Sequence, residues 1–330
     1  MTHCSLSDEA RAYLAENARR NPLPAEQLTL AAARAAAVDL GWRQSAPVPV
    51  AEVRDTFAVG PHGYVPVRIH VPHRREPTGG TGVAPGGAPA LLMLPGGGWV
   101  TGTADIADVA ARRLARDTGA VVVTATYAKA PEHPFPLPLL DCVAAFQWMV
   151  DRASTLGIDP GRIGIIGDSA GGNLAAATAL ALRDSVELGG HRCASTHAPA
   201  ALVLLYPATD AGQDTDSYRE FGTDHGLTAD RMAYYWDCYA GPDTRFHPLA
   251  SVGRAALHDL PPTVVVTAGC DVLRSEGEAF AAGLAAAGTP CELWEYPHTV
   301  HGFVHSDGVL ADADALLTRL GRAVPGLLGG

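Results

Sequence analysis

Several features are scarce or missing in this sequence of 330 residues, and each absence excludes a class of protein. Lysine occurs once, as Lys129, and no basic run or basic-aromatic cluster is present, so nucleic acid is not an expected partner. No stretch approaches the ~18 apolar residues of a membrane span. The charged, helical N-terminus MTHCSLSDEARAYLAENARR lacks the apolar core of a signal peptide. We therefore expect a cytoplasmic protein that does not insert into membranes.

Cysteine patterns typical of metal sites and disulfide frameworks are also missing. The six cysteines are scattered, with no CxxC pair and no His/Cys group at zinc spacing. We expect reduced cysteines in the core, and neither a metal nor an organic cofactor. Apolar residues are abundant, because 47% of the chain is hydrophobic, which is ample for a large core. The formal net charge of -11 mainly favours solubility.

Short apolar segments alternate with helical patterns through the middle of the chain. Residues 52–59 and 65–71 alternate with period two around a turn, which predicts an antiparallel pair of strands. Six further apolar runs are typical of buried parallel strands. The alternation predicts a mostly parallel eight-stranded sheet with helices on both faces. The six runs are 90–94, 120–127, 162–167, 200–206, 262–268 and 290–296, and the helical patterns lie near 105–117, 138–154, 171–183, 275–287 and 310–322.

Two segments depart from this alternation. Residues 1–45 are Ala-rich and helical, and residues 208–250 are long, polar and rich in aromatic side chains. A loop that long inside a compact α/β domain usually covers an active site, so we interpret both segments as parts of a helical cap. The α/β core is then predicted over 46–207 and 251–330. Residues 77–89 are rich in Gly and Pro and are predicted to form a loop.

The pentapeptide GDSAG, residues 167–171, matches the pattern G-x-S-x-G. A predicted strand ends on Gly167 and a predicted helix starts at once, which is the arrangement of a nucleophile elbow. Such a turn strains the serine backbone, tolerates only small neighbours and directs a helix N-terminus at the hydroxyl, where a forming oxyanion is stabilised. Ser169 is therefore the predicted nucleophile. The alternative is a serine that caps an ordinary helix, and Asp168 is expected to have a structural role.

The segment PGGGW, residues 95–99, directly follows the predicted strand ALLML. Consecutive glycines let backbone N–H groups approach a ligand without hindrance from side chains. Two such groups, together with the N–H of Ala170, could bind a tetrahedral oxyanion. A plain turn is the alternative.

Several motifs together resemble the hormone-sensitive-lipase-like family of α/β-hydrolases, which includes many bacterial carboxylesterases. PGGGW is similar to the family's HGGGW, YAKAPEHPFP (127–136) to its YRLAPEHPFP, and GDSAGGN (167–173) matches its elbow. Residues 261–280 resemble its acid-bearing strand and helix, and HGF (301–303) resembles its histidine motif. The resemblance spans roughly residues 90–305 and implies the α/β-hydrolase fold.

The resemblance also implies which backbone groups bind the oxyanion, namely the N–H groups of Gly97, Gly98 and Ala170. One position departs from the family pattern, because Pro95 stands where the family has His. Pro95 cannot supply the hydrogen bonds with which that histidine orients the loop, but its fixed φ could hold the loop in another way.

The acid and the base are sought downstream of Ser169, because α/β-hydrolases order their triad as Ser, then Asp or Glu, then His. Asp271 follows a predicted strand at its carboxyl end, where sites form in such sheets. His301 follows the next strand by one loop. We predict His301 as general base and acid, with Asp271 holding its tautomer and stabilising the imidazolium. The neighbouring candidates are His298, His305, Glu276 and Glu278, and the HGF and GCDVL motifs favour His301 and Asp271.

These predictions lead to a serine hydrolase that cleaves short- or medium-chain acyl esters of small molecules through an acyl-enzyme. Trp99 is a candidate wall of the acyl pocket, and Trp236 and Tyr239 are candidates for the alcohol side, with core packing as the alternative. The same triad could also serve a deacetylase, acyltransferase or cyclase of a specialised metabolite. A non-catalytic binding protein on this scaffold is the third reading. The resemblance further implies pairing into a homodimer through the edge strand near residues 290–296.

Overall fold

The computed structural model describes residues 5–21, 23–73 and 87–329, and its framework is a sheet of eight strands. These are β1 (Glu52–Gly60), β2 (Gly63–Val71), β3 (Ala88–Leu94), β4 (Val121–Ala125), β5 (Ile158–Asp168), β8 (Leu202–Leu205), β9 (Thr263–Cys270) and β10 (Cys291–Val300). They lie in the order β1-β2-β4-β3-β5-β8-β9-β10. Only the pairs β1/β2 and β2/β4 are antiparallel. The prediction of a mostly parallel eight-stranded sheet is confirmed.

The central strands are mostly apolar and are buried along their whole length because both faces of the sheet are covered. Every residue of β4, β8 and β9 is buried, as expected for parallel strands between two layers of helices. At the sheet's edge β1 is largely exposed, which explains its period-two pattern. A small hairpin of β6 (Glu187–Leu188) and β7 (His191–Arg192), which the sequence did not indicate, lies apart from this sheet.

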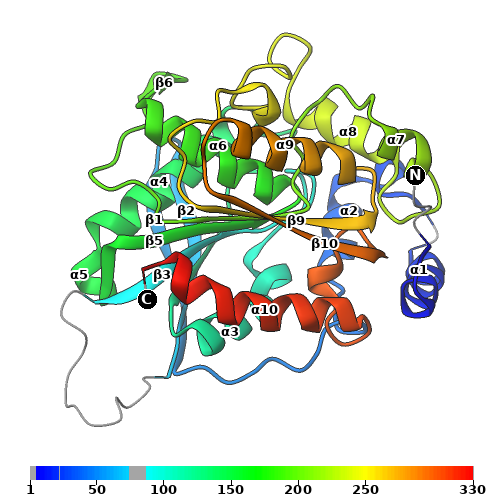
Figure 1. Ribbon diagram of the computed structural model, residues 1–330, viewed down its shortest axis with the longest axis horizontal. Helices are drawn as coiled ribbons and strands as arrows, with labels where there is room; N and C mark the ends of the chain where they lie inside the picture. Colours follow the sequence, from blue (N-terminus) through cyan, green and yellow to red (C-terminus); the bar gives the residue numbers. More distant parts are fainter. Residues whose placement is uncertain (1–4, 22, 74–86, 330) are drawn as a thin grey trace.

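Helices cover both faces of the sheet (Figure 1). On one face lie α3 (Ala104–Thr118) and α10 (Ala311–Leu327), and on the other lie α4 (Leu137–Asp151), α6 (Ala170–Asp184) and α9 (Arg274–Ala286). The single helix predicted over 138–154 is divided into α4 and α5 (Ala153–Leu156). The division falls at Arg152, whose φ of -102° and ψ of 11° leave the helical region.

The two segments outside the alternation are helical, as predicted. The first contains α1 (Asp8–Arg20), the 3-10 helix η1 (Ala25–Gln27) and α2 (Leu30–Ala37), and the second contains α7 (Asp216–Phe221) and α8 (Ala229–Tyr239). In Figure 1 these helices gather on the side toward which the arrows of β9 and β10 point. The loop predicted over 77–89 lies mostly outside the described residues, and its last two residues already belong to β3.

Among the described cysteines, one departs from the expectation. Cys142, Cys193, Cys238 and Cys291 are free, but Cys270 is disulfide-bonded. The prediction that all cysteines are reduced is therefore wrong at Cys270, since spacing along the chain does not reveal which distant cysteines meet in space. Among the described helices, none is both long and apolar enough to cross a membrane.

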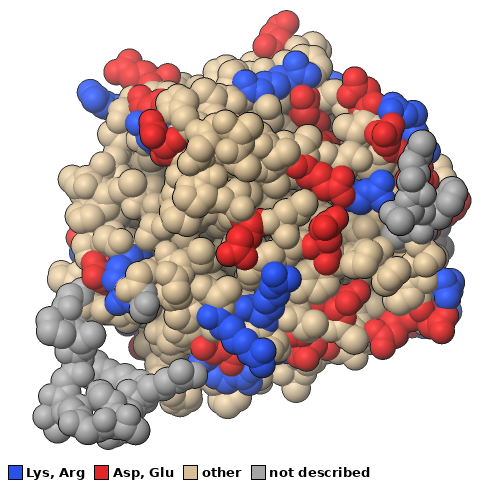
Figure 2. Space-filling view, in the orientation of Figure 1, with Lys and Arg blue, Asp and Glu red and all other residues tan. Residues whose placement is uncertain are grey.

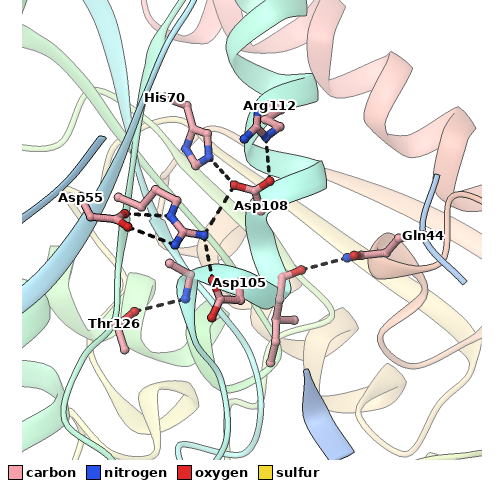
Figure 3. Close-up of polar contacts among 10 residues, drawn as sticks. Gln44, Asp55, His70, Asp105, Asp108, Arg112 and Thr126 are labelled. Atoms are coloured by element: carbon pink, nitrogen blue, oxygen red, sulfur yellow. Dashed lines mark hydrogen bonds and ion pairs between the residues drawn. The ribbon is translucent and has the colours of Figure 1, made fainter. Parts of the chain in front are cut away.

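An ionic network joins β2 to α3 (Figure 3). His70 is fully buried, with its Nε2 2.9 Å from Asp108 Oδ1, and Arg112 Nε donates to Asp108 Oδ2 at 2.6 Å. Arg68 extends the network by donating to Asp105 at 2.8 Å. Burial raises the pKa of Asp108, but the hydrogen bonds from His70 and Arg112 outweigh it and lower that pKa to about 2. The carboxylate of Asp108 thus ties a sheet strand to its covering helix.

Replacing Asp108 with asparagine is expected to lower the free energy of unfolding by about 1.5–3 kcal/mol near pH 7, because two hydrogen bonds lose their charged acceptor. The folded-state pKa of about 2 lies below the ordinary value of 3.8. The stabilisation is therefore complete above about pH 4 and is lost as the pH falls toward 2. Urea unfolding of wild type and Asp108→Asn near pH 7 and near pH 3 measures the difference between their free energies of unfolding. This difference should be smaller near pH 3.

The matched control is Asp105→Asn, which removes a carboxylate that is 64% exposed and paired with Arg68. This change is expected to cost less than about 1 kcal/mol. If Asp108→Asn lowered the free energy of unfolding equally at both pH values, the role assigned to the ionised carboxylate would be wrong.

Candidate active site

A cavity of about 610 Å³ lies at the carboxyl ends of the parallel strands. One wall comes from the loops of the core, with Gly96–Gly98 after β3, Ser169 after β5 and His301 after β10. The opposite wall comes from α1, α2 and α8. Ligands of α/β sheets bind at this end of the strands, and the volume suits a small molecule.

Ser169 stands on a strained turn between β5 and α6. Its φ of 56° and ψ of -122° are rare for a residue with a side chain, and such strain costs about 1–3 kcal/mol. The turn is held by the N–H of Ser169, which donates to Leu205 O at 2.8 Å. A Cβ on Gly167 would collide with the backbone of Gly171, and one on Gly171 with that of Leu94. Both glycines of the motif are therefore required by close backbone packing.

The structure brings the three predicted triad residues into one chain of hydrogen bonds. His301 Nε2 lies 2.8 Å from Ser169 Oγ, and His301 Nδ1 lies 2.7 Å from Asp271 Oδ2. Asp271 is buried, and its Oδ1 accepts the backbone N–H of Leu273 at 3.0 Å. The ring of Tyr206 packs edge-on against His301, with 4.9 Å between the ring centroids. The imidazole is thus fixed between a hydroxyl and a carboxylate, the geometry of a general base.

The glycine loop after β3 presents unused N–H groups beside Ser169. Gly97 and Gly98 have φ values of 117° and 58°, and both line the cavity. Within the described part of the chain, their N–H groups donate to no acceptor. Ala170 opens α6, where the first N–H groups have no acceptor inside the helix. A Cβ on Gly98 would overlap the ring of Tyr235, so only glycine fits there.

Comparisons with known proteins agree with this architecture. A family model described as the α/β hydrolase fold matches residues 91–305. The ethyl acetate hydrolase of Pseudomonas putida is 34% identical over 265 residues, covering 79% of this chain and 78% of that protein. The carboxylic ester hydrolase LipN of Mycobacterium tuberculosis is 35% identical over 280 residues, covering 82% and 70%. The chain belongs to the hormone-sensitive-lipase-like family of α/β-hydrolases.

Solved structures of ester hydrolases extend the similarity to the whole fold of this α/β-hydrolase. An ester hydrolase from the metagenome of Lake Arreo superposes with a TM-score of 0.87 at 33% identity, covering 98% of this chain and 100% of that one. The hyperthermophilic esterase of Pyrobaculum calidifontis gives a TM-score of 0.86 at 31% identity, covering 99% and 100%.

This α/β-hydrolase holds its glycine loop without the histidine that Pro95 replaces. The carbonyl of Pro95 accepts the hydroxyl of Tyr127 at 2.6 Å. The N–H of Gly96 donates to Asp168 Oδ1 at 2.8 Å, and Asp168 Oδ2 lies 3.1 Å from His305 Nε2. Burial raises the pKa of Asp168, but His305 and the N–H of Gly96 outweigh it and hold that pKa below its usual value. An ionised, buried carboxylate therefore supports the loop.

The neighbouring acids and histidines have other partners. His298 is exposed and contacts a backbone oxygen near the N-terminus at 2.8 Å, and His305 contacts Asp168. Glu276 is buried and accepts a backbone N–H at 2.6 Å, while Glu278 lies 3.7 Å from an arginine on the same helix. None of the four contacts Ser169.

The aromatic residues expected at the substrate lie behind the loop. Trp99, Trp236 and Tyr239 are all 0% exposed. Trp99 stacks on Tyr239 with centroids 4.3 Å apart and contacts Trp236 at 4.6 Å. None of the three lines the cavity, whereas Tyr235 does. Trp236 and Tyr239 share one face of α8, and that face packs toward the core. The prediction that Trp99, Trp236 and Tyr239 contact the substrate is therefore corrected, because all three are core residues.

Proposed function

We propose that this α/β-hydrolase hydrolyses carboxylic esters with short or medium acyl chains, using Ser169 as the nucleophile. Relatives that are named ethyl acetate hydrolase and carboxylic ester hydrolase support ester hydrolysis. The observation that carries the proposal is the continuous hydrogen-bonded line from Ser169 through His301 to Asp271, at a cavity of about 610 Å³.

In the first half of the reaction, Ser169 Oγ attacks the acyl carbon while His301 Nε2 takes the hydroxyl proton. The carbonyl oxygen becomes an oxyanion, and the N–H groups of Gly97, Gly98 and Ala170 stabilise it. The intermediate collapses as His301 returns the proton to the leaving alcohol, which leaves an acyl-enzyme. Throughout, Asp271 keeps the proton on Nδ1 and stabilises the imidazolium.

In the second half, His301 takes a proton from water while the water oxygen attacks the acyl carbon. The same N–H groups stabilise the second oxyanion, and collapse breaks the bond to Ser169 Oγ. His301 gives its proton to that oxygen, which regenerates the hydroxyl and releases the carboxylic acid. Each step needs groups of this chain, the ester and water.

We also propose that residues 1–45 and 208–250 form a cap over a core of residues 46–207 and 251–330. Helices of both segments line the cavity that contains Ser169. The N-terminal segment is tied to the core beside the glycine loop, because Arg34 donates to both carboxylate oxygens of Glu132 at 2.7 Å and to Val100 O at 3.0 Å. A cap that encloses the cavity limits the acyl chain to short or medium length.

Two further expectations concern assembly and location. A homodimer through β10 stays a prediction, supported by its place at the end of the sheet and by Leu293, which is 38% exposed there. A cytoplasmic location also stays a prediction, and the disulfide of Cys270 does not favour it, because cytosolic proteins seldom keep structural disulfides.

The test combines covalent labelling with a series of substrates. A fluorophosphonate probe should form its adduct on Ser169, identified by mass spectrometry of the digested protein, because only an activated serine reacts. Denatured protein serves as the control and should remain unlabelled. Of p-nitrophenyl acetate, butanoate, octanoate and palmitate, the first three should be hydrolysed and the palmitate should be poor. An adduct elsewhere, or a preference for palmitate, would overturn the proposal.

A further inference from the structure

Two arginines line the cavity that contains Ser169, and only one of them has an acidic partner. The guanidinium of Arg231 lies 3.3 Å from the carboxylate of Glu26. Arg43 makes no ion pair with any described residue, and its Nε is buried without a hydrogen-bond partner. Its side chain donates one hydrogen bond, from Nη1 to the hydroxyl of Tyr13 at 2.6 Å. Arg43 therefore leaves a positive charge in the cavity wall that the described chain does not neutralise.

This situation contrasts with the rest of the molecule. Most arginines in the described ranges lie within ion-pair distance of a carboxylate, and half-buried Arg68 and Arg112 are examples. On the face shown in Figure 2, acidic and basic side chains lie in small groups of mixed sign. The Nε of Arg43 is removed from water without a partner, which costs free energy. An anionic ligand in the cavity would supply that partner.

The charge of Arg43 is also fixed in position before any ligand arrives. Its backbone N–H donates to Leu40 O at 2.9 Å, and its carbonyl accepts the N–H of Gly308 at 2.9 Å. The second bond ties it to the loop that follows His301. The ring of Tyr13 stacks on Trp42 with 5.6 Å between centroids, and the guanidinium of Arg43 lies over the Tyr13 ring at 5.9 Å. A preorganised guanidinium loses little entropy when it binds a carboxylate.

The acidic residues that line the same cavity form no ion pair with Arg43. Asp168 is engaged by Gly96 and His305, and Asp224 is exposed at the surface. Much of the remaining wall is apolar, with leucines and alanines from α1 and α2 and the segments beside them. The cavity thus combines a reactive hydroxyl, an apolar wall and one unpaired cation.

We propose that Arg43 binds an anionic group, a carboxylate, carried by the ester substrate, so that the enzyme selects acidic esters over neutral ones. This inference rests on the proposed function, because the ester bond must still reach Ser169. The carboxylate accepts charge-assisted hydrogen bonds from the guanidinium, which are stronger than neutral ones. The group can reside on the acyl half or on the alcohol half of the ester, and the experiment separates these two cases.

The experiment measures kcat/KM for two matched pairs of esters at low ionic strength. Ethyl hydrogen glutarate against ethyl pentanoate tests a carboxylate on the acyl half, and γ-acetoxybutyrate against butyl acetate tests one on the alcohol half. Wild type should prefer the charged member of one pair. Arg43→Gln should lower kcat/KM for that member by about 10–100-fold and change the neutral member less than about threefold. Added salt should weaken the preference of wild type.

Two variants keep the test decisive. Arg43→Lys retains the charge and should retain part of the preference, which also covers the case in which Arg43→Gln folds poorly. Arg322→Gln changes the net charge equally at an exposed position of α10 outside the cavity, so it should leave the preference unchanged. If Arg43→Gln lowers both members of each pair alike, or lowers neither, the inference is wrong. Failure of the proposed function has another signature, because wild type would then hydrolyse none of the four esters.

Discussion

Replacing Ser169 with alanine is expected to lower kcat for p-nitrophenyl acetate on the order of 10⁶-fold, with KM nearly unchanged. The variant loses the proposed nucleophilic oxygen, Ser169 Oγ, which lies 2.8 Å from His301 Nε2. The cavity and the N–H groups of the glycine loop remain, so substrate binding should persist. Initial rates at saturating ester measure the effect, after correction for spontaneous hydrolysis.

The matched control is Ser154→Ala, at an exposed position of α5, which should leave kcat unchanged. Asp271→Asn should cost about 10⁴-fold, because the asparagine amide favours the wrong imidazole tautomer. Combining Ser169→Ala with Asp271→Asn should cost no more than Ser169→Ala alone, since residues that act as a unit are not additive. Another group would be the nucleophile if the double variant had a kcat far below that of Ser169→Ala. The same would follow if Ser169→Ala kept a tenth of the wild-type kcat.

The fold was predictable because the patterns that indicate each strand and helix lie within short stretches of the sequence. The runs VVVTA in β4 and TVVVTAGC in β9 are mostly apolar and fully buried, as expected at the centre of a parallel sheet. The elbow was predictable for the same reason, because strand, turn, serine and helix are consecutive in the chain. Gly167 and Gly171 lie too close to neighbouring backbone to carry a Cβ, and the motif G-x-S-x-G already specifies both glycines.

Contacts between distant segments were harder to predict. Order along the chain and the family motifs indicated Asp271 and His301, but nothing in the sequence indicated that Asp168 would meet His305, which lies 137 positions away. Orientation within a helix was also open, because the four aromatic residues of α8 lie on different faces of the helix, and its packing partners decide which face is buried. Arg43 belongs to no sequence motif, and its proposed role rests on the lack of a carboxylate within ion-pair distance among the described residues.

Replacing Asp168 with alanine is expected to lower kcat for p-nitrophenyl acetate by about 10²–10³-fold, the cost of losing an oxyanion donor. Asp168 accepts the N–H of Gly96, which immediately precedes the two proposed donors Gly97 and Gly98. Pro95 offers no side-chain hydrogen bond in its place, so the loop keeps only the contact from Tyr127 on that side. Without the carboxylate, the buried N–H of Gly96 is left unsatisfied, and the loop should move to pair it.

The conservative variant and a distant control distinguish loop positioning from general destabilisation. Asp168→Asn retains an oxygen for the N–H of Gly96 and an amide that can face His305, so it should lose less than about tenfold in kcat. Asp108→Asn weakens another His–Asp contact, whose two residues do not line the cavity, and should reduce stability without changing kcat. Equal losses for Asp168→Asn and Asp168→Ala would mean that charge, not loop geometry, is the contribution of Asp168. Unchanged kcat in both would mean that Pro95 and Tyr127 hold the oxyanion loop alone, because no other described side chain bonds to its first two residues.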